Sequence, residues 1–236
     1  MRKILTPALA TLVLAAFASA QQGGQPGATQ APNPVIDAFE NAGTVGYVIV
    51  AVSIVALALI IEMFINIKRE KLAPPDLVSE IESLFEEQNF QEAMDVCEND
   101  RNYFTNVVHA GLGKLGFAFE TIQGSVREMQ EEETVKLFQK IGYLSLIAAL
   151  APMLGLLGTV TGMFQTFGAI AAAGGSVSPA TLAGGIKSAL VTTIFGLIVA
   201  IPASAFFFMF RNRVIRATIE TNAMCEMLFE RFRAKS

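Results

Sequence analysis

The chain has 236 residues, of which 53% are hydrophobic and 16% are charged, and its formal net charge is −4. Soluble domains carry about 25% charged residues, so this composition argues against a freely soluble protein. The acidic balance and the lack of a basic stripe give no support for a nucleic-acid partner. The two cysteines, Cys97 and Cys225, are too few for a disulfide framework and lack metal-ligand spacing, so we expect no metal site and no cofactor.

Charge is distributed unevenly along the chain. Residues 68–140 contain 8 Lys or Arg and 15 Asp or Glu, whereas Lys187 is the only charged residue between Ile141 and Phe210. A packed soluble core rarely leaves so long a stretch with a single charge. The apolar spacing is helical, and we find no alternating pattern that would predict a strand. We therefore predict an all-α membrane protein with one polar, acidic domain.

Residues 1–20 have the order of a signal peptide: two basic residues, an apolar stretch, and the small-x-small sequence Ala18-Ser19-Ala20. An uncleaved first membrane span is the alternative, but Pro7 and two threonines make it short and weak. Residues 21–34 are uncharged and rich in Gly, Pro and Gln, so we expect residues 21–43 to be a flexible periplasmic segment.

Three apolar segments follow, at residues 44–67, 141–173 and 186–210. Each reaches the roughly 20 residues that a helix needs to cross a hydrocarbon core of about 30 Å. The second segment is longer than this, so its first part is expected to lie below the membrane or to tilt. Glu62 lies near the end of the first segment, which favours an interfacial acid.

The basic residues near the ends of these segments predict the orientation of the chain. They are Lys68, Arg69, Lys71, Lys136, Lys140, Arg211, Arg213 and Arg216. Because Lys and Arg concentrate in cytoplasmic loops, we predict three transmembrane helices with an N-out/C-in topology. The cytoplasmic parts are a helical domain at 68–140 and a C-terminal helix at 211–236. The uncharged connection at 174–185 is the periplasmic loop.

The polar domain has the pattern of short amphipathic helices. One helix is predicted after Pro74, a second after Asn89, whose Glu92 fits a capping box, and a third at Tyr103–Leu115. No helix breaker separates residues 120–140 from the second span or the third span from residues 211–232. The second and third spans are therefore expected to be long helices that extend into the cytoplasm, the third over about 48 residues or roughly 70 Å.

Small and polar residues line one face of each of the two later spans. In the second span they are spaced i, i+4, i+7 and i+11: Gly155, Thr159, Gly162 and Thr166. In the third span they are Gly185, Ala189, Thr192 or Thr193, Gly196 and Ala200. One interpretation is close helix packing, in which small residues are enriched and Thr bonds to its own backbone. The other is a polar path, since polar groups inside a bilayer tend to face cavities.

The sequence GLLGTVTGMFQTF at Gly155–Phe167, together with GIKSALVTTIFGLIVAIPA at Gly185–Ala203, resembles the MotA/TolQ/ExbB proton-channel family. The stretch FQEAMDVCENDRNYFTNVVHAGL at Phe90–Leu112 resembles, more weakly, the helical repeat that precedes the family's second span. A three-span layout with a leader is typical of the ExbB-like, biopolymer-transport branch of that family.

The resemblance also implies roles for particular residues. The threonine of the G-T-V element, which lines the pore in the family, is Thr159 here. The threonine of the A-L-x-x-T element is Thr193, with Thr192 beside it. ExbB and TolQ proteins often carry a glutamate three residues after the glycine of G-I, but this chain has Ser188 there, preceded by Lys187. The resemblance therefore does not imply that this subunit itself titrates during transport.

The two later spans contain no Asp, Glu or His. A proton relay needs a group that gains and loses a proton, which threonine hydroxyls do not do near neutral pH. A carboxylate must therefore come from another chain. The resemblance implies such a chain, an ExbD/TolR-like single-span protein with a membrane aspartate, enclosed by a homo-oligomer of five copies. It also implies a TonB-like energy transducer.

Lys187 and the adjacent Ser188 have two interpretations. The lysine lies close to the external end of the third span, where its long side chain can reach the lipid headgroups at little cost. The alternative is a contact with the partner chain or with the mouth of the cavity.

We therefore expect a multi-pass subunit of the bacterial inner membrane, within a proton-motive-force-driven complex that energises transport across the outer envelope. It is not expected to be an enzyme, because the sequence offers no nucleophile–base pair, metal cluster or phosphate loop. The alternatives are a TolQ-like envelope-integrity subunit, a motility stator subunit, or a non-conducting membrane scaffold. The residues leave open the cargo and the choice between proton and sodium.

Overall fold

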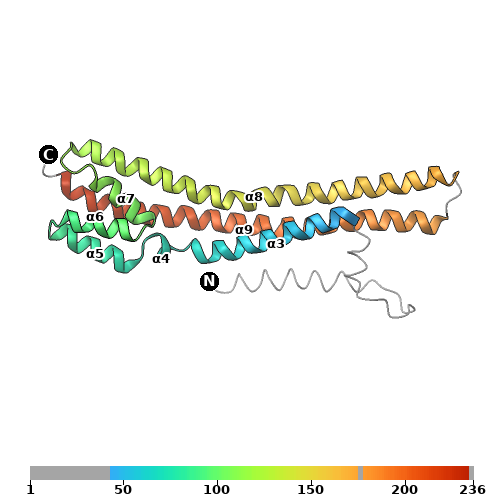
Figure 1. Ribbon diagram of the computed structural model, residues 1–236, viewed down its shortest axis with the longest axis horizontal. Coiled ribbons are helices and arrows are strands. Elements are labelled where there is room, and N and C mark those ends of the chain that lie inside the picture. The colour runs from blue at the N-terminus through green and yellow to red at the C-terminus, as the bar shows by residue number, and fades with distance from the viewer. Residues whose placement is uncertain (1–42, 175–177, 234–236) are drawn as a thin grey trace. The chain divides into compact units, whose positions relative to one another are not determined.

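The computed structural model describes residues 43–174 and 178–233. Within these ranges the chain forms helices and no strand (Figure 1). They are α3 (Gly43–Asn66), α4 (Arg69–Leu72), α5 (Pro75–Glu86), α6 (Phe90–Asn99), α7 (Tyr103–Leu112), α8 (Phe119–Ala172) and α9 (Pro179–Arg233). The expected leader at 1–20 and all but the last residue of the segment at 21–43 lie outside the described residues.

Three of these helices are long and apolar enough to cross a membrane: α3, α8 and α9. The outer surface of α3 is apolar, with Tyr47, Ile54 and Leu57 all exposed. Exposed apolar side chains along a whole helix are costly in water and are typical of a surface that faces lipid. The prediction of an all-α membrane protein with three spans is therefore confirmed.

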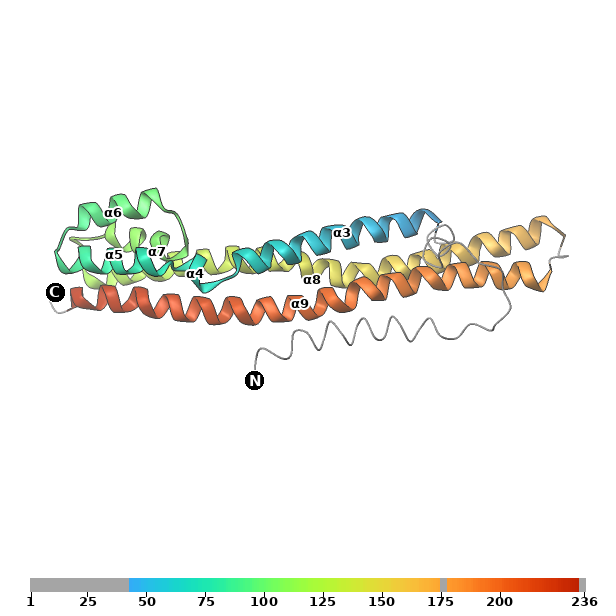
Figure 2. The ribbon, with the colours of Figure 1, turned by 90° about the horizontal axis from the view of Figure 1, so that it is seen from below.

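Helices α8 and α9 are continuous over 54 and 55 residues and run antiparallel, side by side (Figures 1 and 2). Their continuity confirms the prediction that no break separates the polar and apolar parts of either helix. Pro152 and Pro202 lie inside the two helices without ending them. Each proline removes one backbone hydrogen bond, which membrane helices tolerate when neighbouring groups satisfy the freed carbonyl.

The connection between α8 and α9 is shorter than the expected loop at 174–185, because α9 begins at Pro179. The hydroxyl of Ser178 accepts a hydrogen bond from the Thr181 N–H at 3.2 Å and so caps the helix start. Proline suits the first helical position, since its missing N–H has no partner there in any case. The last part of the uncharged stretch, including Gly184 and Gly185, lies inside the helix instead.

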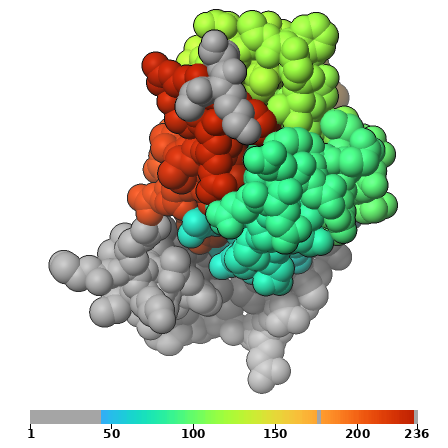
Figure 3. Space-filling model, turned by 90° about the vertical axis from the view of Figure 1, so that its left-hand side faces the viewer, coloured from blue at the N-terminus to red at the C-terminus, as the bar shows by residue number. Residues whose placement is uncertain are grey.

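Helices α5, α6 and α7 pack against the end of the α8–α9 pair that carries the C-terminus (Figure 3). The predicted helix start at Asn89 is present: its side chain accepts from the Glu92 N–H and donates to the Glu92 carboxylate. Asn102 and Thr105 form a reciprocal capping box at the start of α7. The apolar faces of these helices join α8 and α9 in one core, in which Phe85 packs edge-on against Phe229 at 5.7 Å.

A second core joins α3 to α8 and α9 near the end of α3. Phe64 packs edge-on against Phe210 at 5.0 Å, and Ile141 and Leu144 of α8 complete the cluster. The Arg213 guanidinium lies 5.3 Å from the centre of the Phe64 ring. Cation–π contacts of this kind stabilise a charge at the edge of an apolar region.

Candidate functional site

The backbones of α8 and α9 come into direct contact at their glycines. A Cβ added to Gly155 would lie 2.9 Å from the Thr193 Cα, and one added to Gly196 would lie 2.5 Å from the Ala151 carbonyl oxygen. Backbone atoms cannot move aside as side chains can, so no larger residue fits without separating the helices. These two glycines therefore set how closely α8 and α9 approach.

The same contact continues in both directions along the two helices. A Cβ added to Gly162 would lie 3.0 Å from the Ala189 Cβ, and one added to Gly185 would overlap the Thr166 side chain. The predicted stripes on the second and third spans therefore face each other. Gly158 belongs to the same contact because it packs against the Thr192 side chain. The predicted stripe on the second span did not include this glycine.

Two threonine hydroxyls meet across this helix contact. The hydroxyls of Thr159 on α8 and Thr193 on α9 are hydrogen-bonded to each other, and both residues are half-buried. Thr159 Oγ1 lies 3.0 Å from the Ala189 carbonyl oxygen, and Thr193 Oγ1 lies 3.1 Å from the Gly155 carbonyl oxygen. The structure thus brings together two residues that are 34 positions apart in the chain.

This arrangement allows two directions for the hydrogen bond between the hydroxyls, because each hydroxyl carries one proton. In one, Thr193 donates to the Gly155 carbonyl while Thr159 donates to Thr193. In the other, Thr159 donates to the Ala189 carbonyl while Thr193 donates to Thr159. Either way both protons are used, each hydroxyl keeps acceptor capacity, and a further hydrogen bond can be donated only if one hydroxyl turns its proton away from its present acceptor.

Thr192 occupies a different environment from its neighbour Thr193. It is 2% exposed, and its hydroxyl lies 2.7 Å from the Ala189 carbonyl oxygen and 3.2 Å from that of Gly155. A Cβ on Gly158 would collide with its side chain. Thr192 is therefore a packing residue of the helix contact, whereas the Thr193 hydroxyl is hydrogen-bonded to the Thr159 hydroxyl.

The carbonyl of Gly155 is a polar group that the sequence motifs do not identify as part of the site. Three hydroxyls lie within 3.3 Å of this oxygen: those of Thr159, Thr192 and Thr193. A carbonyl has two lone pairs, so the three hydroxyls cannot all donate to it at once. The i, i+4 spacing of Gly155 and Thr159 is the available signal, since a helical Thr commonly bonds to the carbonyl four residues earlier.

Lys187 and Ser188 lie on the same helix as Thr193, eight and nine residues after the start of α9. Lys187 is exposed and Ser188 is half-buried, and Ser188 has interactions with other residues of the chain. The helix begins earlier than expected, so Lys187 lies about 12 Å along the helix from its start. The headgroup anchor and the partner contact therefore both stay predictions for this lysine.

The described membrane segments of α8 and α9 contain no carboxylate and no histidine. Glu62 on α3 is exposed and lies one turn before the helix ends at Asn66. In residues 43–174 and 178–233, no group of three or more His, Cys, Asp or Glu side chains is placed to hold a metal ion. The contact between α8 and α9 therefore offers hydroxyls and carbonyl oxygens, and nothing in these segments gains or loses a proton near neutral pH.

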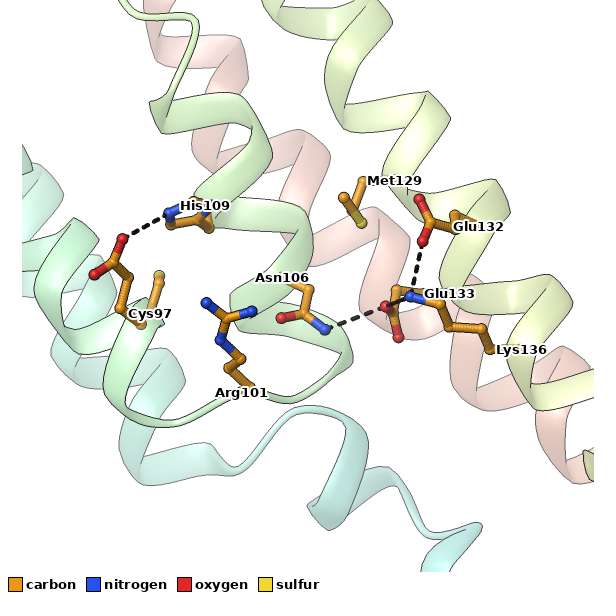
Figure 4. Close-up of a pocket in the computed structure, with 9 residues that line it drawn as sticks. Cys97, Arg101, Asn106, His109, Met129, Glu132, Glu133 and Lys136 are labelled. Carbon is orange, nitrogen blue, oxygen red and sulfur yellow. Dashed lines mark hydrogen bonds and ion pairs between the residues drawn. The ribbon is translucent and has the colours of Figure 1, made fainter.

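A cavity of about 250 Å³ lies in the domain formed by α5, α6 and α7 with the end of α8 (Figure 4). Five of its charged groups form ion pairs: His109 Nε2 lies 3.4 Å from a Glu98 oxygen, and Lys136 Nζ lies 2.8 Å from oxygens of Glu132 and Glu133. Arg101 also lines the cavity. Burial raises the pKa of the Cys97 thiol, which also lines the cavity, to about 12. The thiol therefore stays protonated and is a poor nucleophile, and these residues form no catalytic arrangement.

Known proteins with a similar sequence are membrane transport components. A sequence model of the MotA/TolQ/ExbB proton channel family matches residues 99–222, which include Thr159 and Thr193. An ExbB-like biopolymer transport protein of Synechocystis is 31% identical over 194 residues, covering 76% of this chain and 71% of that protein. The biopolymer transport protein exbB1 of Vibrio cholerae is 48% identical over 104 residues.

The aligned regions do not always span the whole relative. The match to exbB1 covers 42% of this chain and 45% of that protein. An ExbB homologue of Methanothermobacter thermautotrophicus is 29% identical over 169 residues, covering 71% of this chain and 59% of the homologue. This chain therefore spans about half the length of these two relatives.

The fold resembles a solved structure of Campylobacter jejuni MotAB. The TM-score is 0.54, the identity is 14%, and the match covers 95% of this chain and 87% of that one. At this identity the likeness concerns the fold alone. Together with the family match over residues 99–222 and the Synechocystis relative, these findings show that the chain belongs to the MotA/TolQ/ExbB proton channel family and is ExbB-like.

Proposed function

We propose that this chain is the multi-pass subunit of an inner-membrane complex that uses the proton-motive force to energise transport across the outer envelope. In this proposal the ion path runs beside Thr159 and Thr193. The observation that carries it is the hydroxyl pair at the contact between α8 and α9, where both side chains remain half-buried and keep hydrogen-bonding capacity. Membership of a proton channel family supports the same function.

The proton carrier in this proposal is a carboxylate on another chain. The membrane segments of α8 and α9 have hydroxyls and no titratable acid, so a conducting complex needs an acid from elsewhere. An ExbD/TolR-like single-span protein with a membrane aspartate supplies it. A homo-oligomer of this chain, a pentamer, surrounds that helix and places one Thr159–Thr193 pair per subunit around it.

The energetics of the aspartate give the hydroxyl pair its role. An ionised side chain at the centre of a membrane helix costs about 2.5–3.5 kcal/mol on insertion scales. A hydrogen bond from a hydroxyl that turns its proton from a backbone carbonyl to the carboxylate, together with an aqueous path, lowers this cost. Moving one charge across the membrane potential supplies about 2.3 kcal/mol per 100 mV. Cycles of protonation then change which subunit the aspartate prefers, and this drives relative rotation or shear that a TonB-like transducer carries outward.

The proposed topology is N-out/C-in in the bacterial inner membrane. Residues 68–140 and 211–236 are then cytoplasmic, and the connection between α8 and α9 is periplasmic. Lys187 then lies in the outer part of the span, where it contacts headgroups or the partner helix.

The test compares three threonine variants in vesicles that contain this chain and its single-span partner, with proton uptake measured under an imposed potential. Thr159→Val and Thr193→Val are expected to lower the uptake at least tenfold while leaving the oligomer intact. Thr161→Val is the matched control, because the Thr161 hydroxyl is exposed and bonds to the Leu157 carbonyl of its own helix at 2.9 Å.

Unchanged uptake in both Thr159→Val and Thr193→Val would contradict the proposed ion path. Potential-driven uptake by this chain without any partner would contradict the need for a foreign carboxylate. The glycine contacts favour a second candidate, a non-conducting scaffold, because close packing alone accounts for them. A scaffold predicts no uptake in the unmodified complex.

A further inference from the structure

Helices α8 and α9 keep one alignment from the membrane segment to the polar domain. In the membrane segment, Gly162 faces Ala189. In the polar domain, the Tyr103 hydroxyl of α7 lies between Gln130 of α8 and Asn222 of α9. These two contacts are 32 residues apart along α8, from Gly162 to Gln130. They are 33 residues apart along α9, from Ala189 to Asn222, so the two helices advance almost equally between them. An axial shift at one end of such a pair must therefore appear at the other.

Small residues line the whole contact between α8 and α9 in the membrane segment. They recur every three or four positions on both helices: Gly155, Gly158 and Gly162 on α8, and Ala189, Thr192, Gly196 and Ala200 on α9. A slide by one helical turn would place Thr159 opposite Ala189 or Leu197 in place of Thr193. It would also put Thr192 or Ala200 where Gly196 now lies against the Ala151 carbonyl, so the glycine contacts oppose the slide. A second contact that opposes the same slide lies in the polar domain.

The polar domain contains a buried group of polar side chains that does distinguish between alignments. We call it the Tyr103 junction; it consists of Tyr103, Gln130, Thr134, Thr221 and Asn222. Tyr103 is 4% exposed, and its hydroxyl lies 2.7 Å from the Asn222 Oδ1 and 3.0 Å from the Thr134 hydroxyl. It also lies 3.1 Å from the Gln130 carbonyl oxygen. Burial raises the pKa of the Tyr103 phenol, so it keeps the proton that it donates.

Two further polar atoms of the junction belong to side chains of α8 and α9. Gln130 Nε2 and Thr221 Oγ1 are buried, and neither has a hydrogen-bond partner in the part of the chain that the structure describes. Polar atoms in an apolar helix interface lower stability, and their best-attested benefit is to select one register. The junction therefore has the composition of a register-setting layer.

A slide by one turn would disrupt this layer. Thr218 or Glu226 would then lie opposite Tyr103 in place of Asn222. Ala217 or Cys225 would take the position of Thr221. The phenol would then lose its hydrogen bond to the Asn222 side-chain oxygen, which now lies 2.7 Å away. The junction thus opposes a slide independently of the glycine contacts in the membrane segment.

We propose that Tyr103 is a positioning residue that sets the register of α8 against α9 and so holds Thr159 opposite Thr193. The register itself is independent of ion transport, and its consequence for transport rests on the proposed function above. Tyr103 acts at a distance, since Thr134 and Thr159 are separated by about 38 Å of continuous helix.

Disulfide cross-linking in membranes tests the register directly. The reporter is Gly162→Cys with Ala189→Cys, whose Cβ atoms lie close enough for a disulfide after a small adjustment. Two shifted reporters pair Gly162→Cys with Gly185→Cys or with Thr193→Cys, one turn to either side. We expect Tyr103→Phe to lower the yield of the 162–189 disulfide at least threefold and to raise the yield of one shifted disulfide.

Matched variants separate register from folding. Asn222→Leu removes the acceptor of the phenol and is expected to act like Tyr103→Phe, whereas Asn222→Asp keeps an acceptor and is expected to preserve the 162–189 disulfide. Tyr143→Phe removes a phenol hydroxyl from the exposed surface of α8 and is expected to change nothing, since Tyr143 is 60% exposed. General unfolding of the polar domain would lower one disulfide without raising a shifted one.

Unchanged cross-linking in both Tyr103→Phe and Asn222→Leu would overturn the proposal, and so would loss of the 162–189 disulfide with no gain in a shifted one. A shifted register with unchanged proton uptake would support the positioning role and contradict the ion path proposed for Thr159 and Thr193. The two proposals therefore fail separately.

Discussion

At the scale of single residues, the glycines of α8 and α9 differ in what surrounds them. Gly155 and Gly196 face backbone atoms of the opposite helix, whereas no atom lies within 4 Å of a Cβ added to Gly142. A glycine in a helix costs up to about 1 kcal/mol relative to alanine, so a glycine without a close neighbour has no packing reason within this chain. Substitution by alanine is therefore expected to lower stability at Gly155 and Gly196 but not at Gly142.

We predict that Gly196→Ala destabilises the protein by about 1–3 kcal/mol, because its Cβ would lie 2.5 Å from the Ala151 carbonyl oxygen and would force the helices apart. Gly142→Ala is the control and is expected to leave stability unchanged or slightly raised. The measurement is the thermal loss of helical circular dichroism of the detergent-solubilised protein. A Gly196→Ala protein as stable as the unmodified one would show that the contact between α8 and α9 can widen without loss of stability.

Cys97 gives a second prediction at this scale. Its thiol is buried, and burial raises its folded-state pKa from 9.0 to about 12. The unfolded chain therefore releases this proton at lower pH, so this group lowers the stability of the fold as pH rises from about 9 to 12. At pH 8 we expect iodoacetamide to leave Cys97 unmodified in the native protein and to modify it after denaturation, as measured by mass spectrometry. Rapid modification of the native protein would contradict this burial.

At the scale of elements, aromatic side chains hold the short helices against α9. Phe229 is buried, contacts Phe85 of α5, and fills the space over Gly111 of α7, where a Cβ would overlap its ring. One side chain of α9 thus contacts two separate helices. The junction around Tyr103 lies on the same end of α9, so the attachment of α7 has consequences for the alignment of α8 and α9.

We predict that Phe229→Ala destabilises the attachment of α5 and α7 by about 3–5 kcal/mol, the usual cost of removing a buried phenylalanine. Limited proteolysis measures this, because cleavage between α4 and α7 should become faster. Met227→Ala is the control, since Met227 is 66% exposed on the same helix. Equal cleavage of both variants would mean that the Phe229 contacts do not hold these helices.

At the scale of the whole molecule, two helices each combine a membrane segment with a polar extension. α8 and α9 are continuous, so the helix pair that carries Thr159 and Thr193 also carries the attachment sites of α5, α6 and α7. A rigid connection of this kind lets events at the two ends affect each other. The proposed topology places the polar ends of both helices on the cytoplasmic side.

We predict that a membrane-impermeant thiol reagent labels Thr181→Cys from outside intact cells and labels Met227→Cys only after the membrane is opened. Both positions are exposed, near the start and the end of α9. The N-out/C-in orientation is the reason for this difference. The opposite pattern would mean that the basic residues near the span ends do not determine the orientation of this chain.

Much of this architecture could be predicted from residue patterns. The three apolar segments depend on apolar length, and the helix start at Asn89 depends on a capping side chain. The continuity of α8 and α9 depends on the lack of a breaker between the polar and apolar parts of each helix. The helix α9 begins at Pro179, earlier than the uncharged stretch at 174–185 led us to expect. Within this stretch Gly185 packs against Thr166 of α8, a contact that a local pattern cannot reveal.

The sequence by itself determined which residues are apolar, small or hydroxyl-bearing, and hence that the chain crosses a membrane three times and lacks an acid in its two later spans. Only the tertiary structure decided which residues meet: Thr193 rather than Thr192 shares a hydrogen bond with Thr159, and Tyr103 joins Gln130 to Asn222. The physical reason is that periodicity assigns a residue to a helix face, whereas the axial alignment of two helices depends on contacts between residues far apart in the chain.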